Sequence, residues 1–154
     1  TYSASAVGEV NVVTKMKEVN AVIGGEGNGG IIVPDLHYGR DALIGIALFL
    51  THLAKTKMTA SALRASYPAY FMSKKKMDLN ANLSLSTIFE QLKKEFAAYP
   101  MNDVDGLKID FENEWVHLRS SNTEPIMRIY TEAKTQAAAD ALADKIIQLI
   151  LKIQ

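Results

Sequence analysis

The sequence predicts an α+β protein of two units, in which the second unit carries an antiparallel sheet with helices on one face. Three patterns indicate this fold class. Residues 40–55 form an apolar stretch of helical length, and apolar residues recur at helical spacing in residues 135–153. Apolar and polar residues alternate in residues 107–112, 115–119 and 126–130, as they do in strands with one buried face. The alternating stretches are joined by short polar turns, which favours neighbouring antiparallel strands covered by the flanking helices.

The first expected elements surround a loop of glycines. Residues 7–19 have apolar positions at helical spacing, which predicts a helix. A short β-favouring run at residues 21–23 leads into residues 24–30, where five of seven residues are glycine. A second short run at residues 31–33 stops at Pro34, since proline lacks a backbone donor. The glycines therefore form a tightly turned or flexible loop between two short extended runs.

Two helices and an extended segment are expected next. Residues 40–55 are apolar nearly all round, which predicts a helix that is covered on most sides. Thr59 or Ser61 can cap a second, shorter helix, which Pro68 interrupts. Residues 70–79 favour an extended and partly exposed segment that contains the crossing between the two units.

The second unit begins with a helix, continues into strands and ends with a helix. Thr87–Glu90 fits a capping box for the first helix. The apolar stripe expected on it consists of Ile88, Phe89, Leu92 and Phe96. Asp105–Gly106 and Glu112–Glu114 predict the turns before the first two strands of the sheet. Thr135 can cap the last helix. Its expected buried face consists of Ala138, Leu142, Ile146, Leu149 and Ile153.

The composition is ordinary for a globular protein and disfavours several functions. Hydrophobic residues make up 48% of the 154, and 17 Lys and Arg balance 17 Asp and Glu. A nucleic-acid binder normally has a basic surplus, so no nucleic-acid partner is expected. The longest apolar run, Ala42–Leu50, is too short to span a bilayer, so we expect no membrane partner and a cytoplasmic protein. The absence of cysteine excludes disulfides, and the start at Thr1 suggests a piece of a longer protein.

The most informative stretch joins the last two expected strands. Its polar turn runs from Ser120 to Pro125, with Arg119 before it and Arg128 after it. Guanidinium groups can each bind two oxygens of a tetrahedral dianion, and small hydroxyl, amide and N–H groups can bind the others. The residues that such a site would use are Arg119, Ser120, Ser121, Asn122, Thr123 and Arg128. The chemistry alone leaves a solvated hairpin turn as an equally good interpretation.

Two other stretches have both a plain and a functional interpretation. In the glycine loop, Glu26 could accept hydrogen bonds from sugar hydroxyls, and Asn28 could donate and accept. A merely flexible loop is favoured there, and a dinucleotide-binding loop fits poorly because the glycine spacing differs and no helix follows directly. Lys74–Lys76 is more simply a solvated charge run, although one of the three could lie at the mouth of an anion site. No metal site is expected, because carboxylates do not stand at ligand-like spacing from His37, His52 or His117.

Residues 119–133, Arg-Ser-Ser-Asn-Thr-Glu-Pro-x-x-Arg-x-x-x-Glu-Ala, closely resemble the phosphate-binding loop in the last domain of the α-D-phosphohexomutases. This family includes phosphoglucomutase, phosphomannomutase and phosphoglucosamine mutase. The resemblance implies that the substrate's non-reacting phosphate is held by Arg119, Ser121, Asn122 and Thr123, with Ser120 and Arg128 close enough to help.

The glycine loop resembles the Gly-Glu-x-Ser-Gly-His loop with which the third domain of this family recognises the hexose hydroxyls. The match is at Gly25, Glu26 and Gly29, whereas Asn28 and Gly30 replace the serine and the histidine. The resemblance implies that Glu26 and Asn28 bind the sugar. The two replacements leave open whether glucose, mannose or glucosamine is the preferred hexose.

The resemblance covers the whole chain and implies its domain organisation. Residues 1–72 correspond to the latter part of domain three, a partial α/β unit, and residues 73–154 to domain four. The family's phosphoserine loop and its Asp-x-Asp-x-Asp metal loop belong to the first two domains, and nothing in this sequence matches either.

The implied function is interconversion of hexose 1-phosphate and hexose 6-phosphate through a bisphosphate intermediate. The full-length enzyme would use Mg²⁺ and hexose 1,6-bisphosphate, neither bound by this chain, and the missing N-terminal domains would be its partners. The chain alone is expected to be inactive. The alternative is a stand-alone, non-catalytic module with a phosphosugar-binding or a regulatory role.

Overall fold

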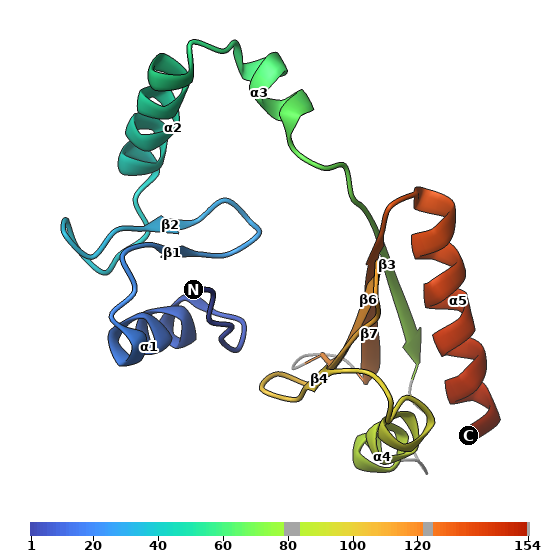
Figure 1. Cartoon of the computed structure of the whole chain (residues 1–154). Coiled ribbons are helices and arrows are strands. Elements are labelled where there is room, and N and C mark those ends of the chain that lie inside the picture. Colours follow the sequence, from blue (N-terminus) through green and yellow to red (C-terminus); the bar gives the residue numbers. More distant parts are fainter. Residues whose placement is uncertain (79–83, 122–124, 154) are drawn as a thin grey trace. The chain divides into compact units, whose positions relative to one another are not determined.

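The computed structural model of the chain describes residues 1–78, 84–121 and 125–153 (Figure 1). It divides into two compact units, Thr1–Pro68 and Ala69–Gln154. Helices and antiparallel strands occur in both units, which confirms the predicted mixed fold class. The division lies before the expected boundary between residues 72 and 73, because Phe71 and Met72 already pair with a strand of the second unit.

The first unit holds a helix packed on a two-stranded antiparallel hairpin and two further helices. Its elements are α1 (Glu9–Val19), β1 (Gly24–Gly25), β2 (Ile31–Ile32), α2 (Ala42–Thr56) and α3 (Ala60–Ser66). A small core of Val12, Met16 and Ile32 joins α1 to the hairpin. The glycine loop is the connection between β1 and β2.

The prediction of an extended run at residues 21–23 is wrong, because strand β1 consists of the two glycines that follow these residues. Val22 and Ile23 are exposed. A Cβ on Gly24 would lie only 2.2 Å from the Sδ of Met16. A residue without a side chain therefore lets β1 run close to α1, and steric fit overrides β-propensity here.

Helix α2 has no buried residue in the described part of the chain. Its N-terminus is capped by Asp41, and Lys57 ends it in the left-handed conformation, with φ at 56°. Leu43 is 77% exposed. The prediction that this helix is covered on most sides is therefore wrong for the described residues, because α2 contacts the two-residue strand β2, which is too small to cover it.

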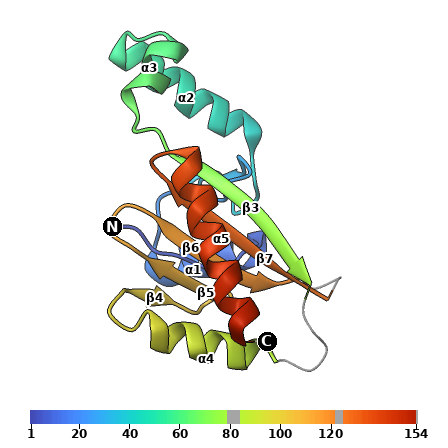
Figure 2. The same ribbon diagram turned by 90° about the vertical axis from the view of Figure 1, so that its right-hand side faces the viewer.

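The second unit, over its described residues, is a five-stranded antiparallel sheet with two helices. Its elements are β3 (Phe71–Asp78), α4 (Leu85–Glu95), β4 (Met101–Asn102), β5 (Leu107–Asp110), β6 (Trp115–Ser120), β7 (Ile126–Ala133) and α5 (Gln136–Ile153). The strand order is β3-β7-β6-β5-β4. Helix α5 lies across the sheet, with α4 near its C-terminal end (Figure 2). Both helices share one core with the sheet, which confirms the predicted arrangement of helices on one face.

The strand register divides this sheet into an apolar and a polar face. Leu118 is in register with Ile129, and both are fully buried in the core under the helices. The preceding residue, His117, is in register with Tyr130. Successive side chains of a strand point to opposite faces. His117 and Tyr130 therefore lie on the face turned away from the helices.

Helix α4 begins at a different cap from the expected one. The Oγ of Ser84 accepts a hydrogen bond from the N–H of Thr87 at 3.2 Å, so the capping box at Thr87–Glu90 is wrong and the helix starts earlier. The expected apolar stripe is confirmed. Its core members are Ile88, Leu92 and Phe96, with Phe89 packed against them.

The predicted cap of α5 is confirmed, but its buried face is shifted. Thr135 accepts a hydrogen bond from the N–H of Ala138 at 3.1 Å. The hydroxyl of the buried Thr131 in β7 donates to the carbonyl of Ala139 at 2.7 Å. Small side chains allow this close approach of helix to sheet. Of the residues chosen from the sequence, Leu142 and Ile146 are therefore buried, whereas Ala138, Leu149 and Ile153 are only partly buried. The buried residues are Ala139, Leu142, Ala143, Ile146 and Ile150.

Candidate functional site

The two arginines singled out in the sequence lie side by side at one end of the sheet. Arg119 of β6 is in register with Arg128 of β7, and the following pair, at Ser120, is the last before the turn. Directly beyond it, the N–H of Ser121 donates to the Ile126 carbonyl at 2.9 Å. Residues in register on adjacent strands have Cβ atoms about 5 Å apart, so both guanidinium groups flank the same turn.

The structure brings some of the six expected phosphate-binding residues together. Arg119 and Arg128 share the face turned away from the helices, and Ser121 lies in the turn itself. Ser120 is in register with the buried Met127, which places its side chain on the other face. Asn122 and Thr123 lie outside the described residues.

The turn before β5 positions Arg119. The Nη1 of Arg119 donates to the Oδ2 of Asp105 at 3.2 Å, and the two side chains are 24% and 33% exposed. The carbonyl of Asp105 accepts a hydrogen bond from the Nε2 of His117 at 2.5 Å. Gly106 has φ at +78°, and a Cβ on it would lie 2.1 Å from the Leu118 carbonyl oxygen. The Asp105–Gly106 turn is therefore pressed against β6, where it orients one of the two arginines.

Sequence reasoning predicted this turn but missed the contact between Asp105 and Arg119. The two residues are 14 positions apart in the sequence. The signal available in the sequence was the alternating pattern of the two strands that lie between these residues. Pairing residues 107–110 with residues 115–118 places the turn that precedes the first strand beside the end of the second strand. The register that fixes this pairing was not predicted.

The second set of expected site residues lies in the first unit, in the glycine loop. The Oε1 of Glu26 accepts a hydrogen bond from the N–H of Gly8 at 3.0 Å, just before α1. The Oδ1 of Asn28 accepts one from the N–H of Gly30 at 3.0 Å. Glu26 is partly buried and Asn28 is exposed. The loop thus has a folded shape in which one carboxylate oxygen is tied to the start of α1.

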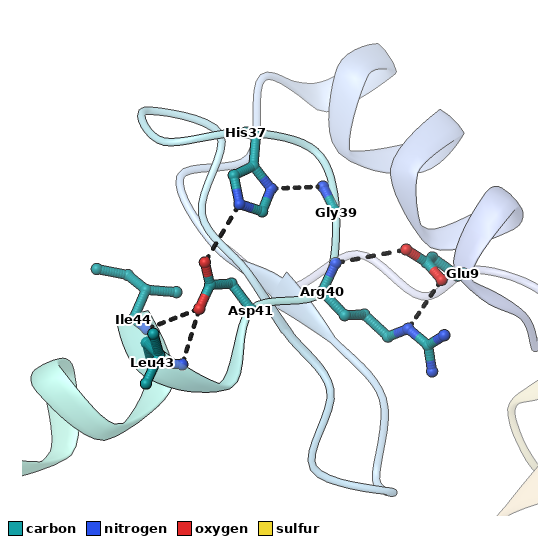
Figure 3. A network of polar contacts seen from close by, with 7 residues as sticks. All are labelled: Glu9, His37, Gly39, Arg40, Asp41, Leu43 and Ile44. Carbon is teal, nitrogen blue, oxygen red and sulfur yellow. Dashed lines mark hydrogen bonds and ion pairs between the residues drawn. The ribbon is translucent and has the colours of Figure 1, made fainter.

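A basic residue beside this loop was also missed. A Cβ on Gly30 would lie 2.9 Å from the Cδ of Arg40, so the arginine stem occupies the space that a side chain at position 30 would need. The Nε of Arg40 contacts the Oε2 of Glu9 at 2.8 Å (Figure 3). This link holds the residues before α2 against α1. The side chain of Arg40 is 54% exposed.

A network centred on Asp41 fixes the start of α2. The Oδ1 of Asp41 accepts hydrogen bonds from the N–H groups of Leu43 at 2.7 Å and Ile44 at 3.1 Å, and its Oδ2 lies 3.2 Å from the Nε2 of His37 (Figure 3). The Nδ1 of His37 accepts from the N–H of Gly39 at 3.0 Å, so the Nε2 carries the proton that Asp41 accepts. The hydrogen bonds to Asp41, from Ile44 first, lower the pKa of its carboxyl below the ordinary value.

We expect acid to weaken the start of α2 through Asp41. A carboxyl whose pKa is lower in the folded state stabilises the fold above its unfolded pKa, and this contribution disappears as the pH falls through the folded value. Amide hydrogen-exchange protection of α2 should therefore decrease below about pH 4. Asp41→Asn keeps a capping oxygen without a titrating charge, so its protection should depend less on pH in this range. Equal pH dependence of the two proteins would contradict the role given to Asp41.

Metal-ligand groups and membrane-spanning helices are both absent from the described residues. No group of three or more His, Cys, Asp or Glu side chains in them is placed to hold a metal ion. The Mg²⁺ of the resembled family thus has no fitting ligand set among these residues. Within the same residues, the helices are too short or too polar to cross a membrane.

Comparison with known proteins decides which family these two sites belong to. Residues 1–70 match the description phosphoglucomutase/phosphomannomutase, alpha/beta/alpha domain III, and residues 76–149 match phosphoglucomutase/phosphomannomutase, C-terminal domain. The chain belongs to the phosphoglucomutase/phosphomannomutase family. The resemblance seen in the sequence is thereby confirmed. The glycine loop lies in domain III of this family, and the turn between β6 and β7 lies in its C-terminal domain.

Individual members of the family are similar along nearly the whole chain. It is 32% identical over 146 residues to the phosphoglucosamine/phosphogalactosamine mutase of Sulfurisphaera tokodaii, and 35% identical over 146 residues to a phosphoglucomutase/phosphomannomutase of Thermococcus kodakarensis. Both comparisons cover 94% of this chain and 32% of the relative. The chain therefore spans about a third of the length of these relatives.

A solved structure supports the same assignment. A phosphoglucomutase/phosphomannomutase family protein from Burkholderia thailandensis superposes with a TM-score of 0.73 and 28% sequence identity. The superposition covers 96% of this chain and 31% of that chain.

Proposed function

We propose that this chain supplies the phosphate anchor and part of the sugar site of a phosphohexomutase that interconverts hexose 1-phosphate and hexose 6-phosphate through a bisphosphate. The observation that carries the proposal is the pair of arginines in register beside the β6–β7 turn of the family's C-terminal domain. Arg119, Arg128 and Ser121 would bind the phosphate that does not react, together with Asn122 and Thr123.

The chemistry of this anchor follows from its charges. The Cβ atoms of Arg119 and Arg128 lie about 5 Å apart, so their guanidinium groups repel each other unless an anion or an acidic side chain lies between or beside them. Asp105 neutralises Arg119 only in part, because a guanidinium has five N–H donors and the structure directs one of them to this carboxylate. The remaining donors suit a phosphate dianion, which takes charge-assisted and bidentate hydrogen bonds.

The anchor of a mutase has to bind the phosphate at either end of the sugar. A site made only of donors can accept the phosphate at either end of the sugar, so the intermediate can turn around and present its other phosphate for transfer. Such transfer is accelerated mainly by positioning and by stabilisation of charge. The chain would thus act by holding one end of the substrate, while the reacting end meets groups supplied by the family's first two domains.

Glu26 and Asn28 would bind the hydroxyls of the sugar. One oxygen of Glu26 accepts from Gly8, and a carboxylate has further acceptor capacity for one or two hydroxyls. Asn28 uses its Oδ1 within the loop, which leaves its NH₂ group as a donor. The glycines around them let a sugar ring approach the backbone closely.

The partners of the proposed enzyme follow from the same assignment. They are the phosphosugar and the family's first two domains. Mg²⁺ and hexose 1,6-bisphosphate would act at those other domains, where Mg²⁺ would help neutralise the transferring phosphoryl group. The cytoplasmic location expected from the sequence stays a prediction.

The 154-residue chain alone is expected to show no mutase activity. Its described residues contain no metal-ligand group, and the phosphoserine loop of the family has no match in the sequence. The measurement is conversion of glucose 1-phosphate to glucose 6-phosphate by the pure chain, with Mg²⁺ and glucose 1,6-bisphosphate present. A complete family member serves as the positive control. Turnover by the pure chain above the uncatalysed rate would refute this division of labour.

A further inference from the structure

The row of cations beside the β6–β7 turn extends onto a third strand. Lys76 of β3 is in register with Arg128 of β7, which is in register with Arg119 of β6. Residues in register on neighbouring strands point to the same face. Three basic side chains therefore stand in line across three adjacent strands, on the face turned away from the helices, one register pair before the turn begins.

The three consecutive lysines of β3 have different surroundings, which separates Lys76 from its neighbours. Lys75 points to the helix face, where its Nζ contacts the Oδ1 of Asp144 at 2.6 Å. The Nζ of Lys74 lies over the ring of Tyr130, 5.6 Å from its centroid. Lys76 is exposed, and its side chain has no ion-pair or hydrogen-bond partner among the described residues. The charge run is therefore not a uniformly solvated face.

This row has an unbalanced positive charge. Like charges directly across neighbouring strands destabilise a sheet. Asp105 faces Arg119 in the described structure, and Asp78 follows Lys76 two residues later on the same face of β3. The hollow lined by Asp110, Glu112, Glu114 and Glu132 lies at the opposite end of β6 and β7, too far along the strands to compensate. Among the residues that the structure describes, two carboxylates thus accompany the three cations of this row.

We propose that Lys76 is a third phosphate-binding cation of the anchor, beside Arg119 and Arg128. The proposal rests on the phosphate site proposed above. With Cβ positions about 5 Å from Arg128 and about 10 Å from Arg119, the flexible four-carbon stem lets the ammonium group turn toward an anion at the row. Lysine adds a compact point charge to the planar forks of the arginines, which suits an oxygen that the forks do not reach. Pairing with Asp78 alone is the plain alternative.

The test compares two lysines of the same strand in the 154-residue chain. Lys76→Gln and Lys75→Gln remove the same charge from adjacent positions, but only the first lies on the face of the arginines. Affinity for inorganic phosphate is measured by ³¹P NMR titration at low and high salt. Lys76→Gln should weaken binding about three- to tenfold at low salt and make it less dependent on salt. Lys75→Gln should change the affinity less than twofold.

The variant Arg119→Gln distinguishes failure of the phosphate anchor from failure of the role of Lys76 alone. If the wild-type chain binds phosphate and Arg119→Gln weakens this binding more than tenfold, the phosphate anchor is supported. In that case, equal phosphate affinities of Lys76→Gln and Lys75→Gln would overturn only the role of Lys76. If wild-type chain does not bind phosphate, or Arg119→Gln binds as tightly as wild type, the anchor and this inference fail together. Thermal unfolding of each variant shows whether a lost affinity reflects a lost fold.

Discussion

Replacing Arg119 by alanine is expected to cost an intact mutase that contains this chain about 2–5 kcal/mol of transition-state stabilisation, the range for truncating one partner of a desolvated charge pair. The value of kcat/KM for glucose 1-phosphate should then fall by about thirtyfold to several thousandfold. The loss has two parts. A bidentate donor disappears, and Asp105 loses the guanidinium that faces it beside the place where the phosphate dianion would bind.

A control substitution of an arginine in the first unit checks that the fall in kcat/KM comes from the phosphate site. Arg64 lies exposed on α3 in the first unit, and Arg64→Ala should alter kcat/KM by less than about twofold. Asp105→Ala should also reduce activity, but less than Arg119→Ala, because it frees the arginine without removing it. Unchanged kinetics of Arg119→Ala in a normally folded enzyme would remove Arg119 from the phosphate site.

Replacing Gly106 by alanine is expected to destabilise the second unit by about 2–4 kcal/mol. Its φ of +78° is costly for a residue with a Cβ. The new Cβ would lie 2.1 Å from the Leu118 carbonyl oxygen and 3.0 Å from the Cα of Arg119. These are backbone atoms of a central strand, so relief requires the turn to move away from β6.

The unfolding of this unit has a convenient reporter. Trp115, the single tryptophan of the sequence, lies in β6, so urea unfolding followed by its fluorescence reports the second unit. Gly27→Ala is the matched control, because a Cβ there would have no atom within 4 Å, and its midpoint should stay near that of wild type. A midpoint of Gly106→Ala equal to that of Gly27→Ala would show that the turn is not pressed against β6 in solution.

The sequence predicted elements better than it predicted their surroundings. Helices at 9–19 and 42–56 and the strands of the second unit were expected close to their observed positions, because periodicity and caps are local signals. The exposure of α2 was not predicted, because an apolar helix pattern does not show which elements of the described chain are available to cover the helix. The strand at Gly24–Gly25 was missed since it depends on the approach to Met16.

The same distinction applies to the candidate site. The residue types of the β6–β7 turn and the family resemblance predicted the two arginines, and the register confirms that they are neighbours. The contact of Asp105 with Arg119 and the alignment of Lys76 with Arg128 depend on pairing between strands that are distant in sequence. Local patterns do not specify such pairing. The binding roles of these residues stay predictions.

The central claim is that the turn between β6 and β7 grips a phosphate dianion. It is tested most directly by recording ¹H–¹⁵N spectra of the 154-residue chain while inorganic phosphate is added. We predict saturable shifts concentrated at the amides of Ser120 and Ser121 and at the side-chain Nε–H groups of Arg119 and Arg128. Shifts that are absent, that do not saturate, or that concentrate away from this turn would contradict the claim.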